Sequence, residues 1–182
     1  MIKKIHKTPF EGLIIIEPKV WHDERGYFYE TFQILELTEA IGNYEFVQDN
    51  LSYSKKNVIR GLHYQINPHA QGKLVTVLKG KVLDVVVDLR KSEPTFGKSF
   101  SVELSDENHL LFFVPPGFAH GFSCLSDDCL FHYKCTDYFH KASERGILWS
   151  DPSLNIDWRI DNPIISGKDQ QLPEWSTVVD FF

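Results

Sequence analysis

The chain has 182 residues, 42% of them hydrophobic and 24% charged, with a formal net charge of −6. This composition is typical of a folded globular domain, and the acidic balance argues against a general nucleic-acid binder, which needs a basic face. No apolar run reaches the roughly 18 residues of a membrane helix, and a signal-peptide core is missing. We therefore expect a cytoplasmic protein with no nucleic-acid and no membrane partner. The odd number of cysteines, three without a CxxC motif, favours neither disulfides nor a zinc site.

The predicted elements are mostly short strands. A strand in EGLIIIEPKVW ends at Pro18, and a short helix over residues 34–42 ends at Gly42. Residues 58–65 (VIRGLHYQ) form a strand, and residues 73–89 are predicted to form a β-hairpin around Gly80. Further strands follow in KSFSVELS, on both sides of a Pro-Gly turn in HLLFFVPPGFAHGFSCLS, and in CLFHYKCTDYF.

Many short strands with few helices predict an all-β sandwich or barrel. No repeat or low-complexity segment divides the chain. We expect a single domain, residues 1–182, with a core over about 12–140. The part over about 144–182 is richer in Asp, Pro and Trp and is predicted to be a C-terminal arm that wraps the barrel.

His63 is the first candidate for chemistry, because Arg60 precedes it closely and Lys73 opens the next strand. Residues three apart point to opposite faces of a regular strand, so Arg60 and His63 would not meet. A bulge or break at Gly61 would re-aim one of the two side chains. We therefore predict an irregular strand at Gly61.

KVLDVVVDL places Asp84 and Asp88 on one strand face, opposite Leu83, Val85 and Val87. A carboxylate among so many valines needs a partner. His120, in PPGFAHGF, is the predicted partner of Asp84.

The motifs together resemble the dTDP-4-dehydrorhamnose 3,5-epimerase family of deoxysugar biosynthesis. The segments that carry the resemblance are DERGYFYE, FVQDNLSYS, VIRGLHYQ, QGKLVTVLKGKVLDVVVDLR, SEPTFGK, PPGFAHGF, YKCTDYF, ERGILWSDP and SGKD, in the order of the family. The resemblance implies a cupin-type jelly roll with N- and C-terminal extensions, a homodimer and a reaction without metal or other cofactor. The implied substrate is a dTDP-linked 4-keto-6-deoxyhexose, which loses and regains a proton at C3 and C5 through enolates.

The resemblance also implies four catalytic roles. His63 matches the base, and imidazole suits this because its ordinary pKa of about 6.5 is near neutrality. Asp169 in SGKD matches the carboxylate paired with that histidine. Tyr133 matches the acid on the opposite side, and Lys73 matches the residue that stabilises the enolate oxygen.

Binding residues are implied in the same way. Arg60 and Arg25 match contacts to the nucleotide and its diphosphate, for which the arginine fork is suited. The other matching positions, which line the substrate site, are Glu30, Gln48, Asn50, His120, Tyr138, Glu144 and Lys168. The chain departs from the family at Leu51, Arg159 and Gly167, none of which is a proposed catalytic group.

Three alternatives stay open. The chain could epimerise only C3 or only C5 of another dTDP-4-keto-deoxysugar. It could be a metal-dependent cupin with ligands from His63, His69 and His120, although Lys73 would repel a cation there. It could also be an inactive sugar-nucleotide binding module, which predicts a missing base or acid, whereas His63 and Tyr133 are both present.

Overall fold

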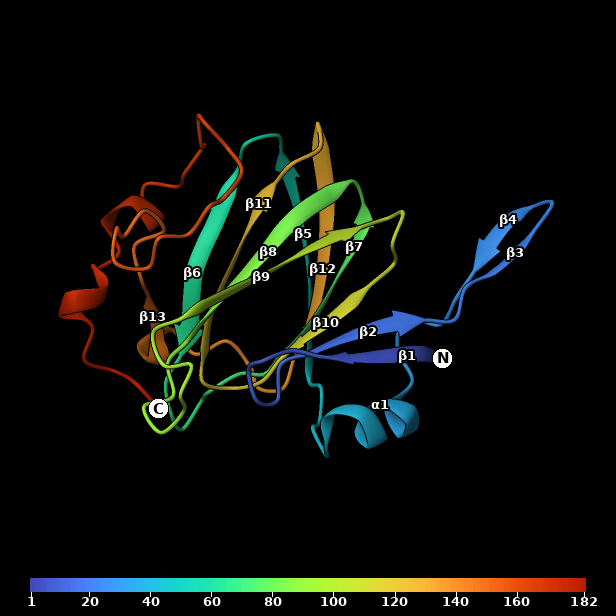
Figure 1. Cartoon of the computed structure of the whole chain (residues 1–182), viewed down its shortest axis with the longest axis horizontal. Helices are drawn as coiled ribbons and strands as arrows, with labels where there is room; N and C mark the ends of the chain where they lie inside the picture. Colours follow the sequence, from blue (N-terminus) through green and yellow to red (C-terminus); the bar gives the residue numbers. More distant parts are fainter.

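Two antiparallel β-sheets make up the body of the protein in the computed structural model, which describes residues 1–182 (Figure 1). One sheet has six strands in the order β1-β2-β10-β7-β12-β5, and the other has five in the order β13-β6-β11-β8-β9. A separate two-stranded hairpin, β3–β4, projects from the body. Two sheets joined by repeated crossings form a jelly roll, so the predicted all-β, cupin-type fold class is confirmed.

The six-stranded sheet consists of β1 (Ile2–Lys7), β2 (Ile14–Pro18), β5 (Gln48–Lys55), β7 (Lys73–Lys79), β10 (Leu111–Val114) and β12 (Asp128–Cys135). The five-stranded sheet consists of β6 (Ile59–Gln65), β8 (Lys81–Asp88), β9 (Ser99–Ser105), β11 (Phe118–Cys124) and β13 (Glu144–Gly146). The remaining elements are the hairpin strands β3 (Trp21–Asp23) and β4 (Gly26–Phe28), helix α1 (Ile34–Ile41), and the 3₁₀ turns η1 (Lys141–Ser143), η2 (Asp169–Gln171) and η3 (Trp175–Thr177).

The core between the sheets follows from the period of two along each strand. On β8, Val82 and Val86 join the cluster between the sheets, whereas Leu83, Val85 and Val87 belong to a second cluster on the outer face. That outer face is covered by apolar side chains of the C-terminal arm. The arm residues packed there include Leu154, Trp158, Trp175, Val178, Phe181 and Phe182.

Helix α1 covers part of the outer face of the six-stranded sheet, where Leu37 packs in a third cluster with Phe113. The side chain of Gln33 caps its first turn by accepting a hydrogen bond of 2.7 Å from the Glu36 amide. Gly42 ends the helix with a φ of 94°, as the sequence predicted, because glycine adopts that conformation without steric cost.

The predicted hairpin over residues 73–89 is wrong. β7 pairs with β10 and β12 in the six-stranded sheet, whereas β8 pairs with β9 and β11 in the five-stranded sheet. Gly80 therefore turns a corner between two sheets instead of closing a ladder. A Cβ on Gly80 would lie 2.2 Å from the Asp128 carbonyl oxygen, so the corner leaves no room for a side chain.

The predicted irregularity at Gly61 is confirmed. The φ of Gly61 is 117°, and the register between β6 and β11 shifts at this point. The two strands approach so closely that a Cβ on Gly61 would lie 2.6 Å from the Cα of Gly121, and one on Gly121 would lie 2.6 Å from the Arg60 carbonyl oxygen. The shift leaves His63 directly opposite His120.

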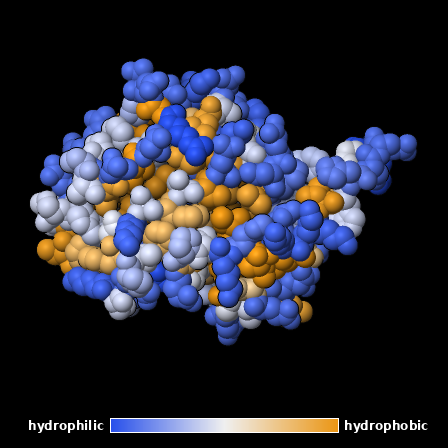
Figure 2. All heavy atoms as spheres, viewed as in Figure 1, coloured by the Kyte–Doolittle hydropathy of each residue, from blue (hydrophilic) through white to orange (hydrophobic).

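The β3–β4 hairpin extends well beyond the jelly roll and keeps large side chains in contact with solvent (Figure 1). Tyr27 is 53% exposed and Phe28 is 65% exposed. On the face shown in Figure 2, hydrophobic residues are visible over the middle of the body, whereas the tip of the hairpin is hydrophilic. No helix in the structure is long and apolar enough to span a membrane.

Candidate active site

A cavity of about 550 Å³ opens between the two sheets. It brings together seven of the thirteen predicted site residues: Arg60, His63, Lys73, His120, Tyr133, Lys168 and Asp169. They come from β6, β7, β11, β12 and the C-terminal arm. The arm therefore supplies part of the cavity wall, and the site cannot be built from the barrel strands alone.

Asp169 is the hydrogen-bond partner of His63, as the resemblance implied. Its Oδ1 lies 2.7 Å from Nε2 of His63, and its Oδ2 accepts a 3.3 Å hydrogen bond from the amide of Gly61. Burial raises the pKa of Asp169, but the hydrogen bonds from His63 and Gly61 outweigh it and hold the pKa below its usual value. An ionised Asp169 accepts the Nε2 proton, and this assigns the tautomer that leaves the lone pair of Nδ1 available as a base.

His120 is the partner of Asp84, as burial alone predicted. Its Nε2 lies 2.9 Å from each carboxylate oxygen of Asp84, which is completely buried. Burial raises the pKa of Asp84, and the nearby His120 and Lys73 partly offset that shift. Since His120 faces His63 across the β6–β11 pair, this second histidine–carboxylate pair supports the floor of the same cavity.

Lys73 extends from the start of β7 into the cavity and makes no ion pair there. Burial lowers its pKa, and the charges of Cys135, Asp84 and Glu144 act in the opposite direction. An ammonium group without a fixed counter-ion inside a cavity is costly for the fold. It is also available to a negative charge on a ligand.

Tyr133 lies on β12, on the six-stranded sheet, whereas His63 lies on the opposing sheet. Burial raises the pKa of its hydroxyl, Cys135 adds to the shift and Arg60 opposes it. The hydroxyl therefore stays protonated at neutral pH. An imidazole and a phenol on opposite walls can remove a proton from one face of a substrate and deliver one to the other.

Arg60 has an exposed side chain at the cavity, although its backbone lies in β6. Its Nε donates to the Ser54 hydroxyl and its Nη2 donates to the Tyr53 carbonyl, each at 3.0 Å. These bonds fix the plane of the guanidinium group. Arg60 and His63 line the same cavity without direct contact, because the irregularity at Gly61 changes the alternation between them.

A smaller cavity of about 180 Å³ shares His63, Lys73 and Tyr133 with the first. Three further predicted residues line it: Gln48, Asn50 and Glu144. Glu144 also forms an ion pair with Lys168 of the arm, with 2.5 Å between the carboxylate and the ammonium group. The three shared side chains thus stand where the two cavities meet.

Three predicted residues lie outside both cavities. Arg25 is on the projecting β3–β4 hairpin and pairs with Asp23. Glu30 lies 3.3 Å from the amino group of Met1. Tyr138 is 63% exposed at the outer rim, beside Phe139, which does line the smaller cavity. A single copy of the chain therefore does not bring Arg25 or Glu30 to His63.

Ser52 is a cavity residue that the sequence reasoning missed. Its hydroxyl is buried and has no hydrogen-bond partner in the protein. The spacing in the sequence could have identified it. Gln48, Asn50 and Ser52 occupy every second position of β5, so their side chains point to the same face of the strand. Other lining residues that were missed are apolar or lie in the irregular arm: Val58, Ile59, Gly121, Phe122, Phe131, Ile164, Ile165 and Ser166.

The three histidines of the metal-dependent alternative are not gathered at one point. His69 lies in the loop after β6, where its ring stacks on His140 with centroids 4.0 Å apart. Its Nδ1 lies 3.2 Å from Asp137. His63 and His120 each use Nε2 for a different aspartate. No group of three or more His, Cys, Asp or Glu side chains in the structure is arranged to hold a metal ion.

Comparison with known proteins matches the chain to one family model, dTDP-4-dehydrorhamnose 3,5-epimerase, over residues 7–177. The enzyme of that name from Shigella flexneri is 55% identical over 164 residues, which are 90% of this chain and 91% of the relative. A crystal structure of a dTDP-6-deoxy-D-glucose-3,5-epimerase from Legionella pneumophila, in complex with dTDP-4-keto-L-rhamnose, superposes with a TM-score of 0.93 at 49% identity, covering 97% of this chain and 94% of the other. A dTDP-4-dehydrorhamnose 3-epimerase from Streptomyces niveus is less similar, with 37% identity over 92% of this chain and 81% of the relative.

The jelly roll, the paired histidine in its cavity and these matches define the protein as a carbohydrate epimerase, and hence as an isomerase. The resemblance found in the sequence motifs is confirmed. The chain belongs to the dTDP-4-dehydrorhamnose 3,5-epimerase family, and its function is the epimerisation for which the family is named.

Proposed function

We propose that the cavity between the sheets converts dTDP-4-dehydro-6-deoxy-D-glucose to dTDP-4-dehydro-L-rhamnose, with the sugar ring held where the two cavities meet. The observation that carries this proposal is the convergence of His63, Lys73 and Tyr133 on that point. A ketone acidifies the C–H bonds on the carbons beside it. A base, an acid and a cation around one ketone are what proton exchange at C3 and C5 requires.

In this proposal Nδ1 of His63 removes a proton from the carbon beside the ketone, and electrons move onto the ketone oxygen to give an enolate. Asp169 keeps the proton of His63 on Nε2 and stabilises the imidazolium that forms. The ammonium group of Lys73 stabilises the enolate oxygen. Tyr133 then donates a proton to the opposite face of the carbon, and the configuration inverts.

Arg60 and Lys168 supply positive charge for the diphosphate. Arg60 offers a guanidinium whose plane is fixed by Ser54 and Tyr53, and a planar fork suits phosphate oxygens. Gln48, Asn50 and Glu144 offer hydrogen bonds along the smaller cavity. The overall charge of −6 makes such local cations necessary, because the protein as a whole repels an anionic substrate.

We also propose a homodimer in which the β3–β4 hairpin of one protomer reaches the cavity of its partner. The hairpin projects from its own jelly roll with Tyr27 and Phe28 exposed (Figure 1). Arg25 on this hairpin cannot reach its own cavity, so its implied contact with the nucleotide requires a second copy. Residues 1–182 act as one unit, since the arm provides Asp169. The cytoplasm fits the three free thiols.

The test is proton exchange followed by NMR. The purified protein is incubated with dTDP-4-keto-6-deoxyglucose in heavy water with a chelator, and deuterium is followed at C3 and C5. Deuterium at both carbons with inversion is the expected result. Deuterium at one carbon alone would establish a mono-epimerase, the class to which the Streptomyces niveus relative belongs by name. Exchange that appears only after metal is restored would overturn the proposed cofactor-independent mechanism.

A further inference from the structure

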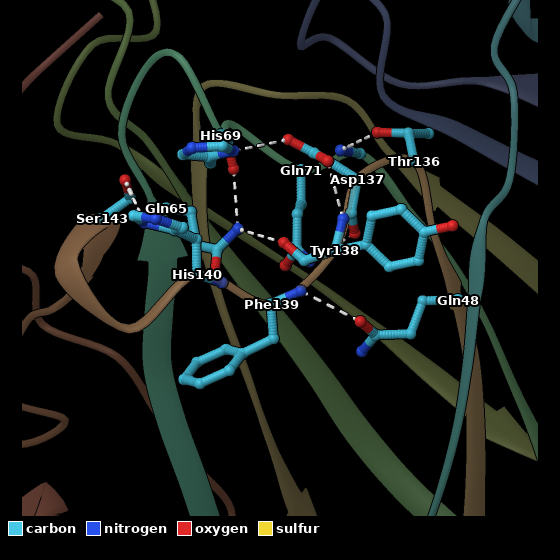
Figure 3. A network of polar contacts seen from close by, with 11 residues as sticks. Gln48, Gln65, His69, Gln71, Thr136, Asp137, Tyr138, Phe139, His140 and Ser143 are labelled. Atoms are coloured by element: carbon cyan, nitrogen blue, oxygen red, sulfur yellow. Dashed lines mark hydrogen bonds and ion pairs between the residues drawn. The ribbon is translucent and has the colours of Figure 1, made fainter.

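Residues 137–140, hereafter the rim segment, follow β12, and Phe139 among them lines the smaller cavity. Figure 3 shows the segment with the polar side chains around it. Hydrophobic burial does not hold this stretch in place. Tyr138, Phe139 and His140 are all exposed, and Tyr138 and Phe139 expose 63% and 55% of their surface. The segment has no strand or helix pairing of its own. Something else must therefore fix its conformation.

Three glutamine carboxamides hold the rim segment by its backbone. Gln71 donates a 2.7 Å hydrogen bond to the carbonyl of Asp137. Gln48 accepts a 2.9 Å hydrogen bond from the amide of Phe139. Figure 3 shows these side chains approaching the rim segment from different sides. All three glutamines also line the smaller cavity, so its wall and the rim segment are joined by the same groups.

Of the three glutamines, Gln65 forms the largest number of these hydrogen bonds. Its Nε2 donates to the carbonyl of Tyr138 at 3.2 Å and to the carbonyl of His69 at 2.7 Å. Its Oε1 accepts from the amide of His140 at 2.6 Å. Only 4% of Gln65 is exposed, and every polar atom of its side chain has a partner. One buried carboxamide thus ties the rim segment to the loop after β6.

The position of Gln65 relates this anchor to the reaction. It lies two residues after His63 on β6, and both side chains line the smaller cavity. We infer that Gln65 is a positioning residue that fixes the rim segment as a wall of the substrate site, so that it controls substrate binding and not proton transfer. The inference rests on the proposed function, because it assumes that the sugar nucleotide reaches the rim segment.

The stacked rings of His69 and His140 form a further contact between the rim segment and the loop after β6. The rings lie 4.0 Å apart and 18° from parallel, His69 pairs with Asp137, and Nδ1 of His140 lies 3.1 Å from the hydroxyl of Ser143. Ser143 is buried, but His69, Asp137 and His140 are half-buried or exposed, so each of their contacts is individually weak. Buried, fully satisfied hydrogen bonds are the costly ones to remove, and those belong to Gln65.

The decisive variant is Gln65→Glu, which has nearly the same shape but loses both N–H donors and places an anion against two carbonyl oxygens. The matched control is Thr76→Val, because Thr76 is equally buried and donates one hydrogen bond of 3.1 Å to the Leu110 carbonyl, away from the rim segment. Gln65→Met, which is uncharged, separates the loss of the donors from the added charge.

Two measurements are made on each variant. In steady-state kinetics with dTDP-4-keto-6-deoxyglucose, both Gln65 variants are expected to raise KM about tenfold, or about 1.4 kcal/mol, with kcat within threefold of wild type. In limited trypsinolysis read by mass spectrometry, cleavage after the exposed Lys141 is expected to accelerate at least tenfold. Thr76→Val should change neither quantity more than twofold.

The outcomes separate the two proposals. Unchanged cleavage after Lys141 would show that Gln65 does not hold the rim segment and would overturn the inference. Faster cleavage with an unchanged KM would overturn it as well, because the rim segment would then not bind substrate. A fall in kcat at constant KM would assign Gln65 to the support of His63 instead. A wild-type protein without turnover would refute the proposed function, whereas proteolysis would still report on the anchor.

Discussion

The carboxylate of Asp169 lies 2.7 Å from the imidazole of His63, although 106 residues separate the two in the chain. The histidine belongs to β6, an interior strand of the five-stranded sheet, and the aspartate belongs to a 3₁₀ turn of the C-terminal arm. The same carboxylate also bonds the amide of Gly61. Docking of the arm and assembly of the proposed base are therefore one event.

Replacing Asp169 by Asn keeps the size of the side chain but removes the charge that holds the tautomer of His63. We expect kcat to fall by roughly 10²- to 10⁴-fold, the range of general acid–base catalysis, with KM changed less than threefold. Initial rates of product formation measure this loss. A variant with kcat within a factor of three of wild type would show that His63 needs no carboxylate partner.

Tyr133→Phe deletes one hydroxyl and leaves the aromatic ring in the cavity. Because burial raises the pKa of this phenol, it is protonated at neutral pH and suited to donate. When the substrate carries deuterium at C3 and C5, we expect the variant to exchange it for solvent protons at a near-normal rate. The inverted product should form at least 100-fold more slowly than with wild type. His63→Ala is the comparison, since loss of the proposed base should stop exchange at both carbons. Normal inversion in Tyr133→Phe would mean that another group, such as water, is the acid.

Lys73→Met is expected to lower the activity and to raise the stability of the protein. The pKa of Lys73 in the folded protein is lowered by burial, so its charged form destabilises the fold below its ordinary pKa of 10.5, and that penalty decreases as pH rises. The methionine removes the penalty and should raise the free energy of unfolding by about 1–2 kcal/mol. In the proposed mechanism this cation stabilises the enolate, so its loss should lower kcat by about 10²- to 10³-fold. Urea unfolding and initial rates test the two effects, and a destabilised variant would contradict this account of Lys73.

The ion pair of Asp88, which lies away from the cavity, is expected to make the stability of the protein depend on pH. Asp88 is fully buried, accepts a two-point ion pair from Arg90 at 2.9 and 2.7 Å, and accepts a 2.6 Å bond from Thr95. Burial raises its pKa, but these partners outweigh it and lower the pKa below 3.8. The stabilisation is therefore present above about pH 4 and is lost as pH falls through the lowered value. Asp88→Asn should cost about 3 kcal/mol at pH 7, and the difference from wild type should shrink below pH 4 in urea titrations. A difference that stays constant with pH would contradict the ionic origin.

Local chemistry in the sequence was sufficient for some parts of the structure. The helix end at Gly42, the irregularity at Gly61 and the pairing of Asp84 with His120 each follow from steric or burial arguments about a few residues. The position of Asp169 beside His63 did not follow from such arguments and came from the family resemblance. Its 106-residue separation leaves no periodic signal in the chain.

Other features depend on information that is not local. The pattern around Gly80 is the same whether the next strand returns to its own sheet or crosses to the other, so the hairpin over residues 73–89 was predicted wrongly. The placement of Arg25 depends on the projection of the β3–β4 hairpin and, in our proposal, on a second copy of the chain. Ser52 was missed although it alternates with Asn50, because a serine in a strand carries no charge to draw attention to it.

The contact between Gly61 and Gly121 also bears on how the protein tolerates change. The spacing of His63 and His120 is set where two backbones touch, without any intervening side chain. Substitutions in the apolar clusters can therefore reshape the walls of the cavity while the two histidines stay at the same separation. The fold in this way sets the separation of the two histidines by backbone contact and leaves the apolar walls of the cavity to side chains that can change.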